Sequence, residues 1–101
     1  MILVRMVCQA KFGKAGEVVA GFKQSQEIVG RVIAPDVRVR ILTDLSGPFD
    51  TVVLEMEVES LAEWERLRTA IFSNPEVQEA EAGMAEVIES GRTEYYTIEA
   101  E

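Results

Sequence analysis

The chain has 101 residues, of which 48 % are apolar and 28 % are charged, and it contains one cysteine and no histidine. That length suits one domain with a modest core, and the composition is typical of a folded globular chain. Without histidine, Ser-His-Asp and Cys-His catalysis are excluded, and the commonest metal and haem ligand is missing. We therefore expect a single domain, residues 1–101, with no metal and no cofactor.

The net charge of −8 is unevenly distributed. Residues 1–50 hold seven Lys/Arg and five Asp/Glu, whereas residues 51–101 hold three and thirteen. Such an acidic surface repels phosphate backbones and anionic lipid, so neither nucleic acid nor a membrane is an expected partner. The N-terminal apolar run contains Arg5 and lacks a cleavage site, which indicates a first strand and not a signal peptide. A lone Cys8 cannot form an internal disulfide, which favours the cytoplasm.

The first half of the chain predicts a strand, a helix and a second strand. Ile2 to Lys11 alternates between apolar and mixed positions, as a strand does. Apolar residues recur at steps of three and four from Glu17 to Val32, which indicates a helix, and Gly21 in that stripe would let it approach the sheet closely. Val37 to Leu45 alternates again, before a turn centred on Gly47 and Pro48.

The second half repeats this plan. Thr51 to Glu59 alternates as a third strand. Ser60 and Glu63 fit a capping box, in which each side chain would bond the other residue's backbone amide at the start of a helix carrying Trp64. Asn74 and Pro75 predict a second helical piece, which we expect to run to Glu89. Gly91 is expected to end it in the left-handed conformation, before a last strand over residues 92–99.

The predicted order is therefore β-α-β-β-α-β, the ferredoxin-like arrangement of the α+β class. It places four antiparallel strands in one sheet with the helices on one face. One register of the middle hairpin satisfies both faces: Leu42 opposes Val53, which pairs Arg40 with Glu55 and Arg38 with Glu57. The same register sets Val39 against Met56 and Ile41 against Leu54, and a slip of one residue would ruin both faces.

The face away from the helices is expected to be mixed in character. Its predicted members are Leu3, Arg5, Val7, Arg38, Arg40, Leu42, Val53, Glu55 and Glu57. The apolar members form a strip that needs a cover, and the natural cover is the same face of a second copy. Two such sheets would enclose a barrel with an apolar part and a charged part.

In this plan the chain resembles the dimeric α/β-barrel superfamily, and within it the NIPSNAP-like proteins. The residues that carry the resemblance are "SLAEWERLRTAIFSNPEV" after the third strand and "ESGRTEYYTI" near the end. The resemblance implies a homodimer through the open sheet faces and does not imply a reaction. Relatives include cofactor-free antibiotic-biosynthesis monooxygenases, muconolactone isomerases and haem-degrading enzymes, and the last rely on a histidine that this chain lacks.

Seven residues are candidates for lining a ligand cavity: Arg5, Arg38, Arg40, Glu55, Glu57, Trp64 and Tyr95. Trp64 shares a helical stripe with leucines, which favours core packing over a cavity wall. If Ile98 faces the helices, Tyr95 faces the barrel, where it is the weak candidate for a catalytic proton donor or a packing residue. The arginines suit a carboxylate or phenolate ligand, but their neighbouring glutamates favour internal neutralisation.

Three functions remain open on these residues. The first is a homodimer that binds a small organic ligand between the sheets. The second is a cofactor-independent monooxygenase or isomerase acting on a small aromatic or lactone-like substrate. The third is a structural or interaction protein whose barrel is filled by side chains. Whether the chain is an enzyme, and on what substrate, is not decided by the sequence.

Overall fold

A computed structural model describes all residues from 1 to 101. Four strands make up the sheet: β1 (Ile2–Ala10), β2 (Val39–Thr43), β3 (Thr51–Val58) and β4 (Ile88–Thr97). The helical elements are α1 (Ala15–Ile28), the π-helical turn η1 (Val29–Ile33), α2 (Leu61–Phe72), α3 (Pro75–Glu81) and the 3₁₀ turn η2 (Met84–Glu86). None of these helices has the length and apolar character that crossing a bilayer requires.

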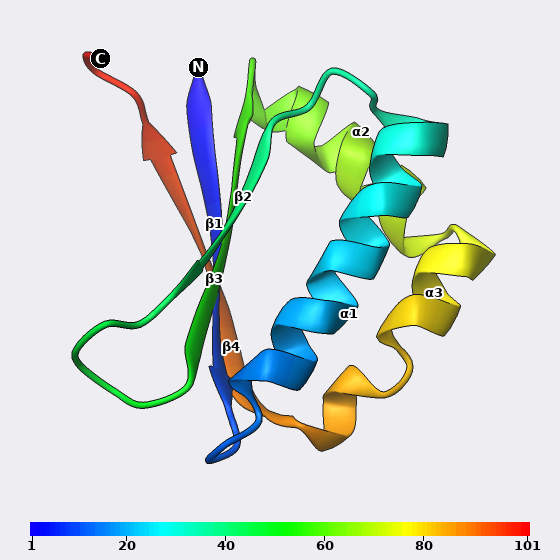
Figure 1. The fold of residues 1–101 in the computed structure, drawn as a ribbon. Helices are drawn as coiled ribbons and strands as arrows, with labels where there is room; N and C mark the ends of the chain where they lie inside the picture. The colour runs from blue at the N-terminus through cyan, green and yellow to red at the C-terminus, as the bar shows by residue number, and fades with distance from the viewer.

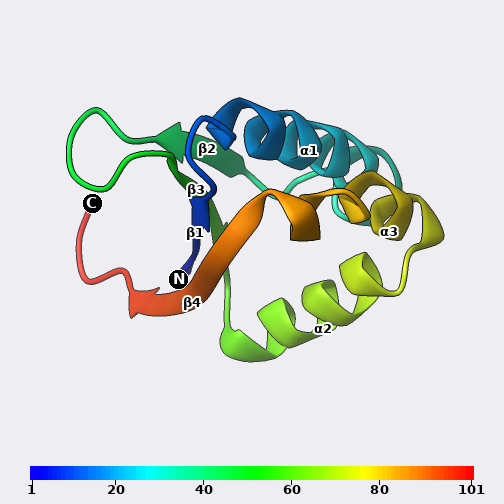
Figure 2. The same ribbon diagram turned by 90° about the horizontal axis from the view of Figure 1, so that it is seen from below.

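The sheet has the strand order β2-β3-β1-β4 and is antiparallel throughout. All helices lie on one face of it, and the other face is bare (Figures 1 and 2). This is the four-stranded ferredoxin-like α+β fold that the sequence predicts. The register of the β2–β3 hairpin is also confirmed, since Leu42 pairs with Val53 and Arg40 with Glu55.

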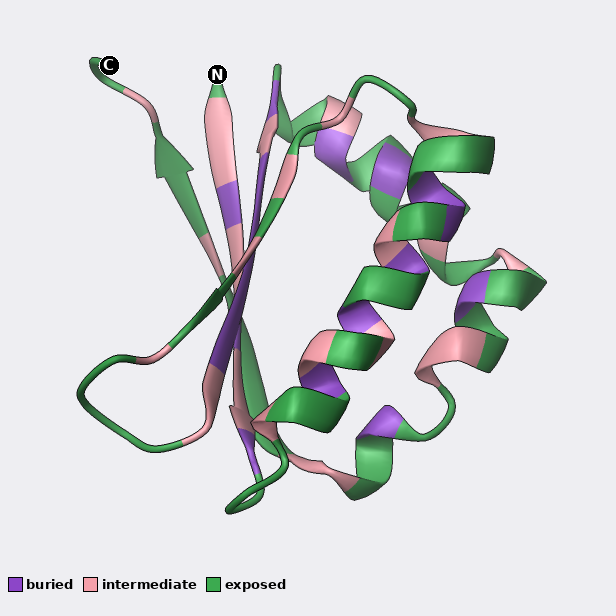
Figure 3. Ribbon diagram, viewed as in Figure 1, coloured by how far each residue is buried: buried purple, intermediate pink, exposed green.

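The core lies between the sheet and the helices (Figure 3). Val4 of β1, Val18 of α1 and Val52 of β3 are completely buried there, and Trp64 of α2 is 5 % exposed. The apolar stripes of both helices therefore face the core over most of their length, as their helical spacing predicts, but Val32 and Leu61 at their ends are exposed. Gly21 of α1 is approached not by the sheet, as expected, but by Met84 of η2, whose Cε would lie 2.8 Å from an added Cβ.

The start of α1 depends on a residue from a distant loop. Asp50, just before β3, accepts hydrogen bonds from the backbone amides of Gly13, at 2.8 Å, and Ala15, at 3.4 Å. Asp50 has a φ of 61°, a left-handed conformation that aspartate tolerates better than most residues. The turn between β2 and β3 is thereby tied to the turn between β1 and α1.

The segment between α2 and the last strand differs from the prediction. Asn74 caps α3 as expected, accepting from the amides of Glu76 and Val77, but α3 ends at Glu81 and not at Glu89. β4 starts at Ile88, so Gly91 lies in the strand opposite Cys8 and ends no helix. Pairing with β1 overrides the weak helical pattern here, because a strand that completes the sheet satisfies more backbone groups.

The predicted capping box of α2 is half formed. The Ser60 hydroxyl accepts a hydrogen bond from the backbone amide of Glu63 at 3.1 Å, as expected. The Glu63 side chain does not return to the Ser60 amide and forms an ion pair with Arg66 instead. The serine alone therefore caps this helix.

Candidate functional site

The bare face of the sheet, here called the open face, is organised in rows across the strands. The ladder pairs set Glu55 against Arg5 and Arg5 against Glu94, so one row of charges crosses the sheet from Arg40 on β2 to β4. An apolar row lies on one side of it, formed by Leu42, Val53 and Val7. On its other side, Glu57, Leu3 and Tyr96 form a third row.

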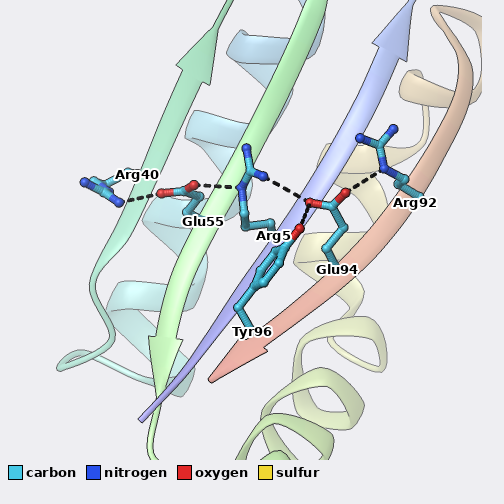
Figure 4. A network of polar contacts seen from close by, with 6 residues as sticks. All are labelled: Arg5, Arg40, Glu55, Arg92, Glu94 and Tyr96. Atoms are coloured by element: carbon cyan, nitrogen blue, oxygen red, sulfur yellow. Dashed lines mark hydrogen bonds and ion pairs between the residues drawn. The ribbon is translucent and has the colours of Figure 1, made fainter. Parts of the chain in front are cut away.

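Glu55 is the centre of the charged row (Figure 4). It is 7 % exposed and accepts from Arg5 Nε at 2.9 Å and from an Nη of Arg40 at 2.5 Å. A buried carboxylate held by two guanidiniums is stabilised as an anion, because each charge-assisted hydrogen bond offsets part of its desolvation. Glu55 is therefore neutralised internally, as the sequence favours, and both of its oxygens are engaged.

Glu94 extends the row on β4 and was missed by the sequence analysis. It accepts from Arg5 Nη1 at 3.0 Å, from Arg92 Nε at 2.8 Å and from the Tyr96 hydroxyl at 3.2 Å. The pKa of Glu94 lies below its usual range, and the hydrogen bond from Arg92 is the main reason. Burial raises this pKa, whereas the Tyr96 hydrogen bond and the charges of Arg92 and Arg5 lower it further. Arg5 thus bridges two carboxylates through its Nε and Nη1 donors.

A groove of about 300 Å³ opens at the end of this face near both chain termini. Its lining residues are Leu3, Arg38, Arg40, Glu55, Met56, Glu57, Ile98 and Glu101. The volume is at the lower end of the range for small-molecule sites. A second hollow of about 310 Å³ lies at the opposite end of the face, beside Gln9, Thr51 and Arg92.

Arg38 does not form the ion pair predicted with Glu57. β2 begins only at Val39, so Arg38 precedes the hydrogen-bonded ladder and its position is not fixed by a cross-strand partner. Both side chains line the groove, and neither takes part in an ion pair or a side-chain hydrogen bond. Glu101, which also lines the groove, is unpaired as well, so the groove holds one guanidinium and two carboxylates that are free for other partners.

The prediction that Tyr95 faces the open side is wrong. Tyr95 pairs with Val4, a core residue, so it lies on the helix-covered face, whereas Tyr96 pairs with Leu3 and lies on the open face. The prediction took Ile98 as the marker of the helix side. Ile98 follows the last residue of β4 and lines the open-face groove, so it does not mark that side.

Tyr95 instead meets Trp64 beneath the helices. The Trp64 indole Nε1 donates a hydrogen bond to the Tyr95 hydroxyl at 3.1 Å. Trp64 packs in the main core cluster, in agreement with the structural interpretation of its helical spacing. The seven candidates thus divide in two: Trp64 and Tyr95 lie on the helix side, and the two glutamates and three arginines lie on the open face. Their part in ligand binding stays a prediction.

A narrow hollow of about 50 Å³ lies between the sheet and the helices. Trp64 and Phe22 contribute to its mainly apolar wall, and its polar members are Ser25, Gln26 and Glu81. Burial raises the pKa of Glu81, and a hydrogen bond from the Ser25 hydroxyl at 3.4 Å partly opposes this. Burial is also the main cause of the raised pKa of Cys8, and the charge of Glu81 adds to it. This Cys8 thiol is therefore a poor nucleophile at neutral pH.

Comparison with known proteins supports the fold. No family model matches the sequence, and no curated protein matches it either. Among solved structures, an uncharacterised NIPSNAP domain protein from Burkholderia xenovorans is 18 % identical, with a TM-score of 0.77 over 96 % of this chain and 93 % of that one. The protein Atu4242 from Agrobacterium tumefaciens gives a TM-score of 0.82 at 14 % identity, over 96 % and 92 %.

A third similar structure comes from Nitrosomonas europaea and is provisionally assigned as an antibiotic biosynthesis monooxygenase. It is 16 % identical, with a TM-score of 0.72 over 96 % of this chain and 97 % of that one. The structural neighbours are thus NIPSNAP-domain proteins and monooxygenase-like proteins of the ferredoxin fold, the superfamily that the sequence resembles. At these identities the similarity establishes the fold, and a shared fold does not establish a shared reaction.

Proposed function

We propose that the open face is the interface of a homodimer. The support comes from apolar side chains that a single chain leaves exposed on this side of the sheet. Leu42 and Tyr96 lie on the face itself, and the β2–β3 loop, which projects away from the helices (Figures 1 and 2), carries Leu45, which is fully exposed, and Phe49, which is 72 % exposed. Exposed apolar groups gathered on one side of a small protein commonly mark an interface.

The charged row suits an interface between two copies. Val7 and Val53 are already buried within one chain, so the apolar row needs less cover than the sequence suggests. Arg40 at one end of the charged row and Arg92, which pairs with Glu94 from the neighbouring row, keep about two thirds of their side chains exposed and have unused donors. In a two-fold dimer each copy would present the same residues to the other. The unused arginine donors could then bind acceptors of the second sheet and so fix how the two sheets are aligned.

The dimer is tested by light scattering at micromolar concentration. The wild-type protein is expected at twice the mass of one chain, and a double change Leu45→Asp with Phe49→Asp is expected at the mass of one chain. Leu61→Asp is the matched control, because Leu61 is also exposed but lies on α2, away from the open face. A wild-type protein that scatters as a monomer would refute the interface.

The function that the geometry supports best is the binding of a small organic ligand in the open-face groove. The single observation that carries this proposal is the unpaired Arg38 at a groove of about 300 Å³. In the dimer this groove lies between the two sheets, partly sheltered from water. A thermal-shift screen of small organic acids, amines and amino acids tests the proposal: stabilisation of wild type but not of Arg38→Ala supports it. No stabilisation by any compound would favour the third function, a structural or interaction protein.

A second candidate function is a cofactor-independent monooxygenase or isomerase acting on a small aromatic or lactone-like compound. It is favoured by Trp64, which lines a hollow together with Glu81, a carboxyl with a raised pKa, and which donates a hydrogen bond to the Tyr95 hydroxyl outside that hollow. Such groups suit proton transfer in an apolar site. Oxygen uptake and isomer formation on electron-rich phenols and lactones would fall in Tyr95→Phe and stay unchanged in Tyr96→Phe, its neighbour on the opposite face.

A cytoplasmic location accords with these proposals. Cys8 is the one cysteine of the chain and is free, as a reducing compartment would keep it.

A further inference from the structure

We propose that the ligand of the open-face groove is a small zwitterion with an apolar side chain, of the class of the aliphatic α-amino acids. This inference rests on the proposed ligand-binding function and adds the chemical class. It comes from three kinds of group that meet in one groove: free positive charge, free negative charge and an apolar wall.

The positive side of the groove is Arg38. Its guanidinium has no carboxylate partner in the chain, and it lies one residue before β2, where the strand's pairing leaves it free to turn toward a ligand. Arg40 lines the same groove, with one Nη donor committed to Glu55. A guanidinium offers parallel N–H donors that match the two oxygens of a carboxylate, so these arginines select a ligand with a carboxylate end.

The negative side is Glu57, which is half-buried in the groove wall and has no ion-pair partner. Together with Glu55 and Glu101, the lining residues carry three carboxylates against two guanidiniums, a net charge of −1. A ligand that is only an anion would meet this excess of negative charge, and a ligand that is only a cation would leave Arg38 unused. A ligand that carries both an ammonium and a carboxylate satisfies Glu57 and Arg38 together.

Met56 of β3 borders the groove, but its side chain packs into the core on the other face of the sheet. The apolar wall of the groove is therefore formed by Leu3 of β1 and by Ile98, which follows β4, and these side chains present only hydrocarbon. An aliphatic side chain on the ligand would bury apolar surface against them, which stabilises the complex. A polar side chain would lose its water without gaining a partner there.

The simplest opposing view is that Arg38 and Glu57 pair with each other in solution. Both line the same groove, and extending the β2–β3 register by one residue would set them opposite each other. In that case the two charges would cancel, and the groove would discriminate poorly between charged ligands. The experiment below separates the two views, because each charge is removed by itself.

Isothermal titration calorimetry with three probes tests the proposal. The probes are L-leucine, 4-methylpentanoate, which lacks the ammonium, and 3-methylbutylamine, which lacks the carboxylate. Wild type is expected to bind leucine saturably and at least about tenfold more tightly than either analogue, the scale of one charge-assisted hydrogen bond. Arg38→Gln is expected to lose the preference over the amine, and Glu57→Gln the preference over the acid.

Arg66→Gln is the matched control, since Arg66 is an exposed arginine on α2 whose only ion pair is with Glu63 on the same helix. It is expected to bind leucine as wild type does. Circular dichroism and light scattering on each variant show that the fold and assembly are retained.

Two results would overturn the zwitterion. One is equal affinity for leucine and 4-methylpentanoate, which would make the groove an anion site and leave ligand binding intact. The other is that leucine gives no saturable heat up to millimolar concentration, although another class of compound stabilises the protein in the thermal-shift screen. A protein that no class of compound stabilises would instead overturn the proposed function itself, so the two failures are distinguishable.

Discussion

The two faces of the sheet are built from the same strands but are held together differently. On the helix-covered face, β3 contributes Val52, Leu54 and Met56 to an apolar core. On the open face, the same strand contributes Val53 and Glu55, which are buried to a similar degree. The two faces therefore do not differ in how deeply their residues are buried. They differ in what buries them: apolar side chains on the helix-covered face, and a network of opposite charges on the open face.

The largest effect is expected on the helix-covered face. Trp64→Ala removes a buried aromatic side chain and its hydrogen bond to Tyr95, and it should lower the free energy of unfolding by about 3–5 kcal/mol. Leu61→Ala, at an exposed position of the same helix, should cost no more than about 0.5 kcal/mol. Urea denaturation followed by circular dichroism measures both, and losses of similar size would contradict this division.

The next effect is expected at the centre of the open face. Glu55→Gln removes the charge that holds Arg5 and Arg40, and it should lower the free energy of unfolding by about 2 kcal/mol. Glu57→Gln, on the same strand but without an ion pair, should change it by about 0.5 kcal/mol or less. If Glu55→Gln were as mild as Glu57→Gln in urea denaturation, the network would contribute little to the fold.

A smaller effect is expected at the end of the two central strands, where the loop before β3 meets the start of α1. Asp50→Ala removes the acceptor of the Gly13 and Ala15 amides at the start of α1, and it should cost about 1 kcal/mol. Asp50→Asn keeps one acceptor oxygen and tolerates the left-handed backbone, so it should cost less than half as much. Thermal unfolding ranks the two variants, and the reverse order would show that these hydrogen bonds are not what stabilises the turn.

The smallest effect is expected at Glu81 and depends on pH. Because burial raises the pKa of Glu81 in the folded chain, its protonated form favours folding. That contribution is complete below the unfolded pKa of about 4.3 and is lost as the pH rises through the folded value. Glu81→Gln should therefore be more stable than wild type at pH 7, by less than about 1 kcal/mol, and equal to it or weaker near pH 4.

Glu79→Gln, which changes an exposed glutamate of the same helix, is the control for that comparison and should leave the pH profile unchanged. Chemical denaturation from pH 4 to pH 8 gives the profile for each variant. The reaction of Cys8 with a disulfide reagent at pH 8 is an independent check. It should be faster in Glu81→Gln, since the charge of Glu81 adds to the raised pKa of the thiol.

Sequence patterns predict the features of this fold that are local or strongly periodic. The β2–β3 register and the helix caps at Ser60 and Asn74 are of this kind. Each follows from a repeat of two or about four residues, or from a short motif whose hydrogen bonds stay within one turn.

The missed features depend on contacts between distant segments. Because apolar and polar residues alternate only weakly in β4, Ile98 alone was used to predict which of its residues face the helices. Tyr95 and Tyr96 were therefore each assigned to the wrong face of the sheet. Glu94 could have been found only with the correct register against β1. The cap that Asp50 provides for α1 joins residues 35 or more positions apart, and no local pattern indicates such a pair.

Glu55 forms ion pairs with both Arg5 and Arg40, and this has a consequence for how the sequence can evolve. A single replacement at this position leaves two guanidiniums without their shared anion, one of them held between Glu55 and Glu94. Replacements of Arg5, Arg40 and Glu55 should therefore be non-additive, each being better tolerated once a partner has already changed. We expect the charged row to be kept or lost as a unit among descendants of this chain, whereas Arg38 and Glu57, which have no such ties, are free to vary with the ligand.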